Sequence, residues 1–382
     1  MTHPGACGKI STHLIGNEAD RMKNHDEVTR NAVAYYDSIS VKPYVHPFLK
    51  PGETERGLPE IESILSLNRD MDPYVRKACC GRTKLLNRDE FVPLSFLHFS
   101  DVHGVLDLWN RITEFLNHYD DCLSFALHTG DYCGDSQDQF VDFYAEGIPA
   151  KLPVLNCVGN HDTVAGPNWE KQSKRSTWEK LFCHTENWDA TFLDCDWSMT
   201  YYRDFPASNV RLIVLDLYYD LEKQVTWLEQ VLEEAGAKGL HVITAMHQPS
   251  GPIVQKVDTT FQTLTAFQEG EEVPFDAVIG RFIQSGGHYI CNLAGHYHSD
   301  WFGYTANGVL NIAVECATDW SGWCEGCRTR GTRCYDCFNV VAVDTDLGLL
   351  KLVRIGDNAD HYLRTKRVLC YDYQNRTVVY NG

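Results

Sequence analysis

The sequence predicts an α/β fold that is recognisable from Leu94 onward, and three observations predict it. Short apolar runs bounded by glycine or proline recur along the chain, which is typical of buried strands. Segments with the helical spacing of apolar residues alternate with these runs. Hydrophobic residues make up 43% of the 382 residues and aromatic residues 12%, which is enough to build a large core and argues against disorder.

Five of the expected strands are each followed closely by a polar motif. The strands are expected at Leu94–Phe99, Leu123–His128, Val154–Val158, His241–Met246 and Tyr289–Ala294. The motifs are Phe99-Ser100-Asp101-Val102-His103-Gly104, Gly130-Asp131, Gly159-Asn160-His161-Asp162, Met246-His247-Gln248-Pro249 and Gly295-His296-Tyr297-His298. Because α/β sheets place their ligands at the carboxyl ends of strands, these oxygen and imidazole side chains are expected to form a metal site.

The remaining elements follow from the same periodicities. Helices are expected at Val105–His118, Gln137–Glu146, Leu221–Ala235 and Phe275–Gln284. Further strands are expected at Ser198–Phe205, Val210–Leu217, Trp301–Tyr304, Val309–Val314 and Phe338–Asp344.

In this order the motifs resemble those of the calcineurin-like metallophosphoesterase superfamily, whose pattern is Asp-x-His, Gly-Asp, Gly-Asn-His-Asp/Glu, His and Gly-His-x-His. The resemblance covers roughly Leu94 to Val343. It implies a sandwich of two β-sheets flanked by helices. It also implies two metal ions with the following ligands: Asp101, His103 and His298 on one ion, Asn160, His247 and His296 on the other, and Asp131 bridging both.

The implied function is hydrolysis of a phosphomonoester or phosphodiester. Two divalent ions about 3.5–4 Å apart neutralise the phosphoryl oxygens and supply a bridging hydroxide for in-line attack. Mixed carboxylate, amide and imidazole ligands favour Mn, Fe or Zn. His161, which is not a ligand in the family, is expected to act as general acid, and Asp162 is expected to orient it.

Two other functions stay open. One is a nuclease of the same superfamily, which the formal net charge of −18 disfavours because nucleic acids bind to basic surfaces. The other is a non-catalytic protein in which the metal core is a structural or interaction scaffold. His98 and His128 lie inside apolar runs and are expected to be core residues, not ligands.

The chain divides near residue 90. Residues 1–90 contain three prolines within Val41–Pro51 and are expected to be an extension that wraps the catalytic domain. Residues 91–382 are expected to form the metallophosphoesterase domain that the resemblance implies, with a tryptophan-rich insertion at 163–200 and a β-rich tail at 345–382. Trp320 and Trp323 could join this insertion in an aromatic lid, which suggests a nucleotide substrate.

Two Cys-x2-Cys pairs, separated by six residues, are expected to form a hairpin at 320–338. They are Cys324, Cys327, Cys334 and Cys337. Four thiolates in this arrangement are typical of a closed structural Zn²⁺ site. Disulfides, a redox pair and unligated thiols are the alternatives.

The expected partner is a small phosphorylated molecule, and neither nucleic acid nor a membrane is expected. No apolar stretch approaches the ~20 residues that span a bilayer. The first residues lack a basic region followed by an apolar run, so no secretory signal is expected. The expected location is therefore the cytoplasm. The oligomeric state is not predicted.

Overall fold

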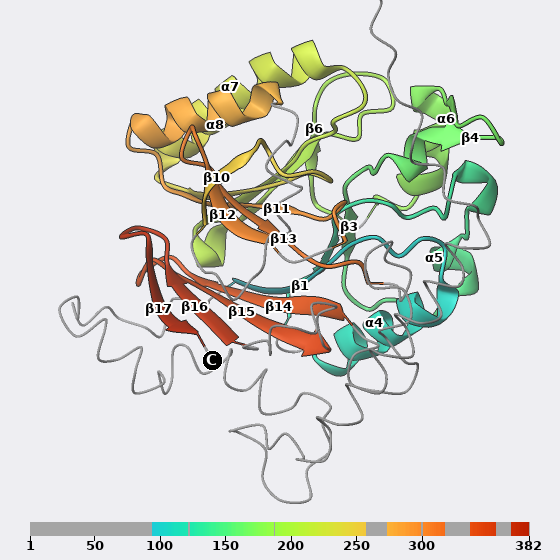
Figure 1. Cartoon of the computed structure of the whole chain (residues 1–382), viewed down its shortest axis with the longest axis horizontal. Helices are drawn as coiled ribbons and strands as arrows, with labels where there is room; N and C mark the ends of the chain where they lie inside the picture. The colour runs from blue at the N-terminus through green and yellow to red at the C-terminus, as the bar shows by residue number, and fades with distance from the viewer. Residues whose placement is uncertain are drawn as a thin grey trace, which may run out of the picture.

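Two large β-sheets lie one over the other in the computed structural model (Figure 1), which describes residues 94–120, 123–186, 188–256, 273–298, 301–317, 337–356 and 368–381. The first sheet has the strand order β17 (Thr377–Asn381), β16 (Val368–Asp372), β15 (Leu349–Gly356), β14 (Cys337–Asp344), β1 (Leu94–Phe99), β2 (Ala126–His128) and β3 (Val154–Asn156). The second has the order β10 (Ile253–Lys256), β12 (Trp301–Thr305), β13 (Leu310–Ala313), β11 (Tyr289–Ala294), β9 (His241–Ala245), β8 (Val210–Val214), β7 (Tyr201–Phe205) and β6 (Thr191–Phe192).

Parallel pairing places the ends of the key strands together. In the first sheet β1 pairs in parallel with β2, and β2 with β3. In the second sheet β9 pairs in parallel with β11, and β11 with β13. The carboxyl ends of β1, β2 and β3 therefore share one sheet edge, and those of β9 and β11 share another.

Alternation along the strands divides the apolar residues between two cores. In β8, Leu212 and Val214 belong to the core between the sheets, whereas Ile213 belongs to a second core. This second core also contains Leu228 of α7 (Leu221–Lys238) and Phe275 of α8 (Pro274–Gln284). Because successive strand residues point to opposite faces, one sheet can pack against the other sheet and against these two helices at once (Figure 1).

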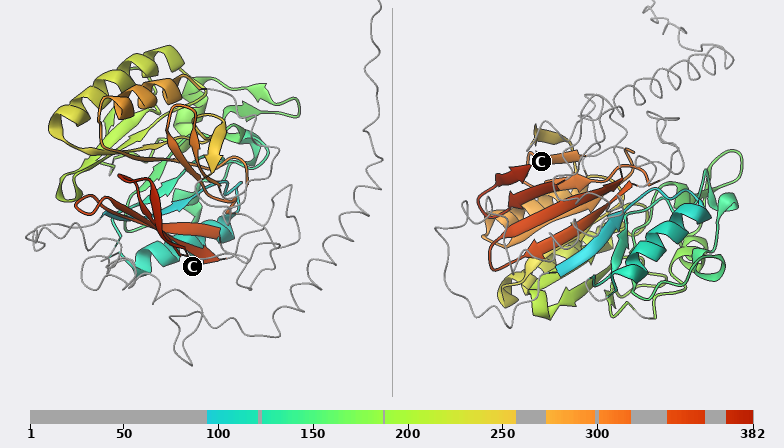
Figure 2. Two further views of the ribbon diagram at one scale, coloured as in Figure 1. Left: turned by 60° about the vertical axis from the view of Figure 1, so that its left-hand side comes forward. Right: turned by 90° about the horizontal axis from the view of Figure 1, so that it is seen from below.

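The remaining helical and short elements are α4 (Leu106–His118), η2 (Gln137–Gln139), α5 (Phe143–Glu146), η3 (His161–Thr163), β4 (Val164–Ala165), β5 (Glu170–Lys171), α6 (Lys174–Leu181) and η4 (Pro206–Ser208). Seen from below, α4 lies beside β1 at one side of the first sheet (Figure 2). Its buried residues Leu108, Ile112 and Leu116 recur at helical spacing, as the sequence predicts.

The predicted sandwich is confirmed, but the prediction of one helix is wrong. Gln137–Glu146 forms a 3₁₀ turn and a separate single helical turn, because Phe140 between them is extended. The carboxylate of Asp142 accepts hydrogen bonds from the backbone N–H groups of Tyr144 and Ala145 and so starts a new helix. Several strands are also shorter than predicted; β2 begins only at Ala126 and β3 ends at Asn156.

Some predictions concern residues outside the described part of the chain. These are the wrapping extension at 1–90, the tryptophans at 320 and 323, and Cys324, Cys327 and Cys334. Cys337 is described: it is buried and begins β14. No helix among the described residues is both long and apolar enough to cross a bilayer.

Candidate metal centre

The predicted ligands come from five loops that follow β1, β2, β3, β9 and β11. The loops are tied to one another through their backbones: the N–H of Asp101 donates to Gly130 O at 2.9 Å, and that of His103 donates to Asp131 O at 3.1 Å. Across the two sheets, the N–H of His296 donates to Oδ2 of Asp101 at 3.1 Å. The loops therefore form one bonded unit in which the side chains converge.

Left-handed backbone is concentrated at these positions. Among the predicted ligands, the residues with positive φ are Asp101 (56°), His103 (48°), Asp131 (58°), His296 (70°) and His298 (52°). Non-glycine residues seldom adopt this conformation, and it persists only where surrounding contacts impose it. Such strain is characteristic of functional sites.

The first group of side chains contains Asp101, His103, Asp131 and His298, whose candidate ligand atoms lie within 4.8 Å of one another. Nε2 of His298 lies 3.2 Å from Oδ1 of Asp101 and 3.2 Å from Nε2 of His103. Oδ1 of Asp101 is buried, and it faces the ring nitrogens of His298 and His103, the second at 3.9 Å. A buried carboxylate oxygen that faces two imidazole nitrogens is suited to a shared cation.

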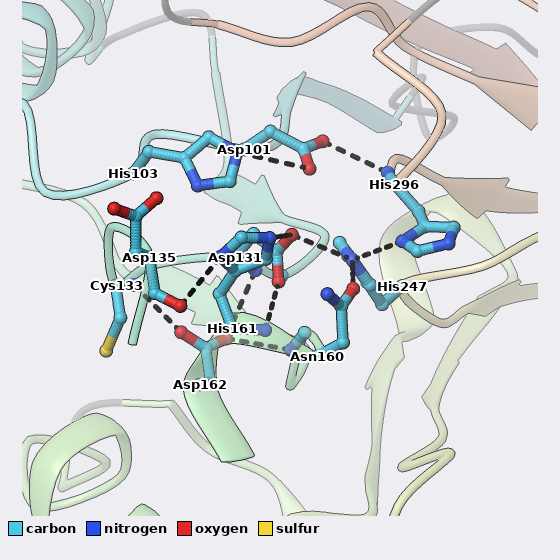
Figure 3. A network of polar contacts seen from close by, with 12 residues as sticks. Asp101, His103, Asp131, Cys133, Asp135, Asn160, His161, Asp162, His247 and His296 are labelled. Carbon is cyan, nitrogen blue, oxygen red and sulfur yellow. Dashed lines mark hydrogen bonds and ion pairs between the residues drawn. The ribbon is translucent and has the colours of Figure 1, made fainter. Parts of the chain in front are cut away.

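The second group contains Asp131, His247 and His296. Nε2 of His247 lies 3.2 Å from Oδ2 of Asp131 and 3.2 Å from Nδ1 of His296. The same nitrogen lies 3.0 Å from Oδ1 of Asn160, so the amide oxygen faces this group as well. Figure 3 shows Asp131 at the centre of the network, within reach of both groups.

The electrostatics favour cations at this position. Burial raises the pKa of Asp131, but His247 and the other nearby histidines outweigh this and hold the pKa well below its ordinary value. The pKa of Asp101 is also lowered, because His298 and His247 oppose the effect of burial. Burial lowers the pKa of His247, yet Asp131 raises it to about 9. Two ionised buried carboxylates thus need positive charge beside them, either as protons or as metal ions.

His161 lies beside the two groups and belongs to neither. Its N–H donates to Oδ1 of Asp131 at 3.0 Å, and its ring Nδ1 lies 3.2 Å from the backbone carbonyl oxygen of Asp135. A carbonyl can only accept, so Nδ1 is the protonated nitrogen in this contact. Nε2 is left facing Oδ2 of Asp131 at 3.7 Å.

Asp162 makes different contacts from those expected. Its carboxylate accepts hydrogen bonds from the backbone N–H groups of Gly159 (2.7 Å), Cys133 (2.8 Å) and Asp131 (3.1 Å). Burial and the nearby carboxylate of Asp131 raise its pKa to about 6. The side chain therefore joins the loops after β2 and β3, while the His161 ring is held by Asp135 (Figure 3).

Gly159 is needed for this close approach of the two loops. A Cβ atom at this position would lie 2.1 Å from the backbone nitrogen of Asp131 and 2.1 Å from its Oδ1. These distances are far below van der Waals contact, so the glycine of the Gly-Asn-His-Asp motif serves packing.

Cys316 is a further candidate ligand, which none of the five sequence motifs contains. Its thiol lies within 4.8 Å of the candidate ligand atoms of His103 and His298, and it approaches the backbone oxygen of Asp101 at 3.2 Å. Cys316 follows β13, which pairs in parallel with β11, so it lies at the same sheet edge as the Gly-His-x-His loop. A polar Glu-Cys pair after the apolar run Val309–Val314 was the signal available in the sequence.

Further predictions for this region concern two histidines, expected in the core, and the four tryptophans of the insertion. His98 and His128 are fully buried, as expected for core residues. In the insertion, Trp188 is buried in the main core and Trp178 packs partly against it. Trp169 and Trp197 expose 47% and 40% of their surface.

Comparison with a protein-family model gives a match to the calcineurin-like phosphoesterases over residues 94–300, more than half of the 382-residue chain. Comparison with curated protein sequences finds no match.

Three solved structures illustrate the structural likeness. A dimetal phosphatase from Danio rerio matches with a TM-score of 0.48 and 14% identity, over 69% of this chain and 96% of that one. A purple acid phosphatase from yellow lupin (Lupinus luteus) matches with a TM-score of 0.44 and 13% identity, over 75% and 55% of the two chains. GAP50, the anchor in the inner membrane complex of Plasmodium, matches with a TM-score of 0.37 and 13% identity, over 70% and 86%.

Proposed function

The chain belongs to the calcineurin-like phosphoesterase family, and on that premise we propose that it hydrolyses a phosphomonoester or phosphodiester with the help of two divalent metal ions. The observation that carries the proposal is the position of Asp131. It is the one residue shared between the group of Asp101, His103 and His298 and the group of His247 and His296. A carboxylate in that position can hold two ions at a short, fixed separation.

We assign the ligands by these two groups. Asp101, His103 and His298 would hold one ion, and Asn160, His247 and His296 would hold the other. When bound, the two ions supply charge neutralisation of the phosphoryl group and lower the pKa of water. The mixture of carboxylate, amide and imidazole donors favours Mn, Fe or Zn.

His161 is proposed to donate a proton to the leaving-group oxygen. The hydrogen bond from its Nδ1 to Asp135 O fixes the ring orientation and leaves Nε2 as the nitrogen that exchanges a proton with the substrate. Its side chain is 12% exposed, whereas the Asp131 carboxylate behind it is 1% exposed, so the imidazole lies on the side open to solvent. Asp162 contributes by holding the loops that carry Asp131 and Asn160.

Three further proposals follow from the sequence. The substrate is a small phosphorylated molecule, since a net charge of −18 repels long polyanions. The four cysteines 324, 327, 334 and 337 hold a structural zinc ion. The protein is cytoplasmic.

The test is hydrolysis of p-nitrophenyl phosphate and bis-p-nitrophenyl phosphate by protein that has been stripped of metal and reloaded with Mn²⁺, Fe²⁺ or Zn²⁺. We expect one of the two esters to be hydrolysed in a metal-dependent manner. Faster turnover of the first would identify a monoesterase, and of the second a diesterase. Two tightly held ions without turnover of either ester would instead support the non-catalytic scaffold.

A further inference from the structure

A short hairpin carries an exposed tryptophan to the edge of the metal centre. The hairpin, β4–β5, begins directly after the His161–Thr163 turn (Figure 1). Its loop is closed by a hydrogen bond from the N–H of Trp169 to Gly166 O at 3.1 Å. The N–H of Gly166 donates to the carboxylate of Asp138 at 2.6 Å, which ties the loop to the body of the protein.

The indole of Trp169 lies against the proposed proton donor. The ring centroids of Trp169 and His161 are 4.8 Å apart and the ring planes are inclined by 68°, an edge-to-face contact. Trp169 also exposes 47% of its surface and has a left-handed backbone with φ of 53°. Since a half-exposed tryptophan adds little to the core, packing alone does not explain a bulky residue in this conformation.

The cationic group nearest to Trp169 along the hairpin is already engaged elsewhere. Nζ of Lys171 donates to Tyr218 O at 3.0 Å and lies 5.1 Å from the ring centroid of Tyr219. The N–H of Gly166 contacts the carboxylate of Asp138, and the exposed Glu170 follows Trp169 directly. The hairpin therefore places an indole and carboxylates beside His161, which suits an uncharged planar group better than a second phosphate.

From this placement we infer that Trp169 is a specificity-determining residue that stacks on the leaving group and selects phosphate esters whose leaving group carries an aromatic ring system, such as a nucleoside. The inference rests on the proposed function, because it takes the leaving-group oxygen to lie at His161. An aromatic face stacks on any nucleobase, so the selection is for the class of leaving group and not for one base.

Two substrates that carry the phosphate on the same primary 5-hydroxyl of ribose, with and without a base, test it: adenosine 5′-phosphate and ribose 5-phosphate, or their methyl esters if only diesters are turned over. We expect the wild type to favour the adenosine ester. Trp169→Ala should lower kcat/KM for that ester by about 5- to 150-fold, the range that one stacked base contributes, mainly through a higher KM. The loss for the ribose ester should be much smaller, so that the preference shrinks, and Trp169→Phe should retain most of the preference.

Trp197→Ala is the matched control. Trp197 is 40% exposed and has φ of 51°, like Trp169, but its ring packs under Arg175 at 5.5 Å. This variant should keep the preference for the adenosine ester. An equal loss on both substrates in Trp169→Ala would overturn the inference and make Trp169 a positioning residue for His161. A wild type without preference would overturn it as well.

If the wild type hydrolyses no ester at all, the proposed function fails. Calorimetric binding of adenosine 5′-phosphate to the metal-loaded protein then tests, without turnover, whether Trp169 stacks on the base. Weaker binding by Trp169→Ala than by Trp197→Ala would support the inference, and equal binding would overturn it.

Discussion

Replacing Asp162 with Asn separates its two conceivable roles, orienting His161 or holding the loops together. In the structure Oδ2 accepts hydrogen bonds from the N–H groups of Asp131 and Gly159, and Oδ1 accepts one from Cys133. An asparagine oxygen can keep the first two, but its amide NH₂ then faces the N–H of Cys133. Two donor groups then face each other, and the buried N–H of Cys133 loses its acceptor; each unsatisfied donor costs ~1–3 kcal/mol of stability.

The same change should weaken metal binding more than catalysis. Because Asp131 and Asn160 are carried by the two loops that Asp162 joins, we expect a ~10–100-fold loss of metal affinity, the usual effect of removing a group that supports ligands. At saturating metal, turnover should return to within a few-fold of the wild type. The assays are urea unfolding, metal titration by calorimetry, and kcat measured against metal concentration.

Asp142→Ala is the matched control for this experiment. The carboxylate of Asp142 also accepts two backbone N–H groups, at the start of α5, so its loss should cost about 0.5–2 kcal/mol. Metal affinity should be unchanged, because Asp142 does not belong to either group of candidate ligands. If Asp162→Asn bound metal and unfolded like the wild type but lost turnover at saturating metal, Asp162 would act on catalysis directly and not by holding the loops together.

Three further outcomes are expected. His161→Ala should lower turnover by about 10²–10⁴ while both ions are retained, with a smaller loss for good leaving groups; loss of an ion would show that His161 is a ligand. Burial and the neighbouring His288 lower the pKa of His241 to about 4, below the ~6.5 of an unfolded chain, so its contribution to stability is complete above about pH 6.5 and is lost as the pH falls through 4. His241→Gln should therefore flatten the fall in unfolding free energy over that window, and an unchanged slope in urea unfolding would contradict this. Cys327→Ser should release one chelation-resistant zinc ion per chain and leave the other two metal ions bound; mass spectrometry that found disulfides among the four cysteines would exclude the zinc site.

Much of the site could be predicted because the same signal recurs. An apolar run that is followed closely by polar residues and bounded by glycine or proline marks the end of a buried strand, and parallel pairing then gathers such ends at one edge. Asp101, Asp131 and His247 were found in this way and lie together in the structure. The family resemblance supplied the grouping of ligands about each ion, which spacing alone does not give.

Other features depend on three-dimensional geometry that the sequence does not state. Asp162 follows His161 directly, which suggested a contact between them. In the 3₁₀ turn His161–Thr163, however, successive side chains point about 120° apart, so Asp162 is buried while His161 stays partly exposed. Cys316 joins the site only through the pairing of β13 with β11. The break in Gln137–Glu146 arises because the Asp142 carboxylate accepts hydrogen bonds from the backbone N–H groups that follow it and so starts a new helix. The spacing of apolar residues does not predict such a bond.

The metal content of the wild type and of Asp131→Asn tests the central proposal most directly. Protein stripped of metal is reloaded with Mn²⁺, passed over a desalting column and analysed by plasma mass spectrometry, with the exposed Asp194→Asn as the matched control. We expect two manganese ions per chain in the wild type and in Asp194→Asn. In Asp131→Asn we expect neither ion to be held tightly, because a neutral amide cannot be shared between two cations. Two ions retained by Asp131→Asn, or fewer than two in the wild type, would contradict a dinuclear centre bridged by Asp131.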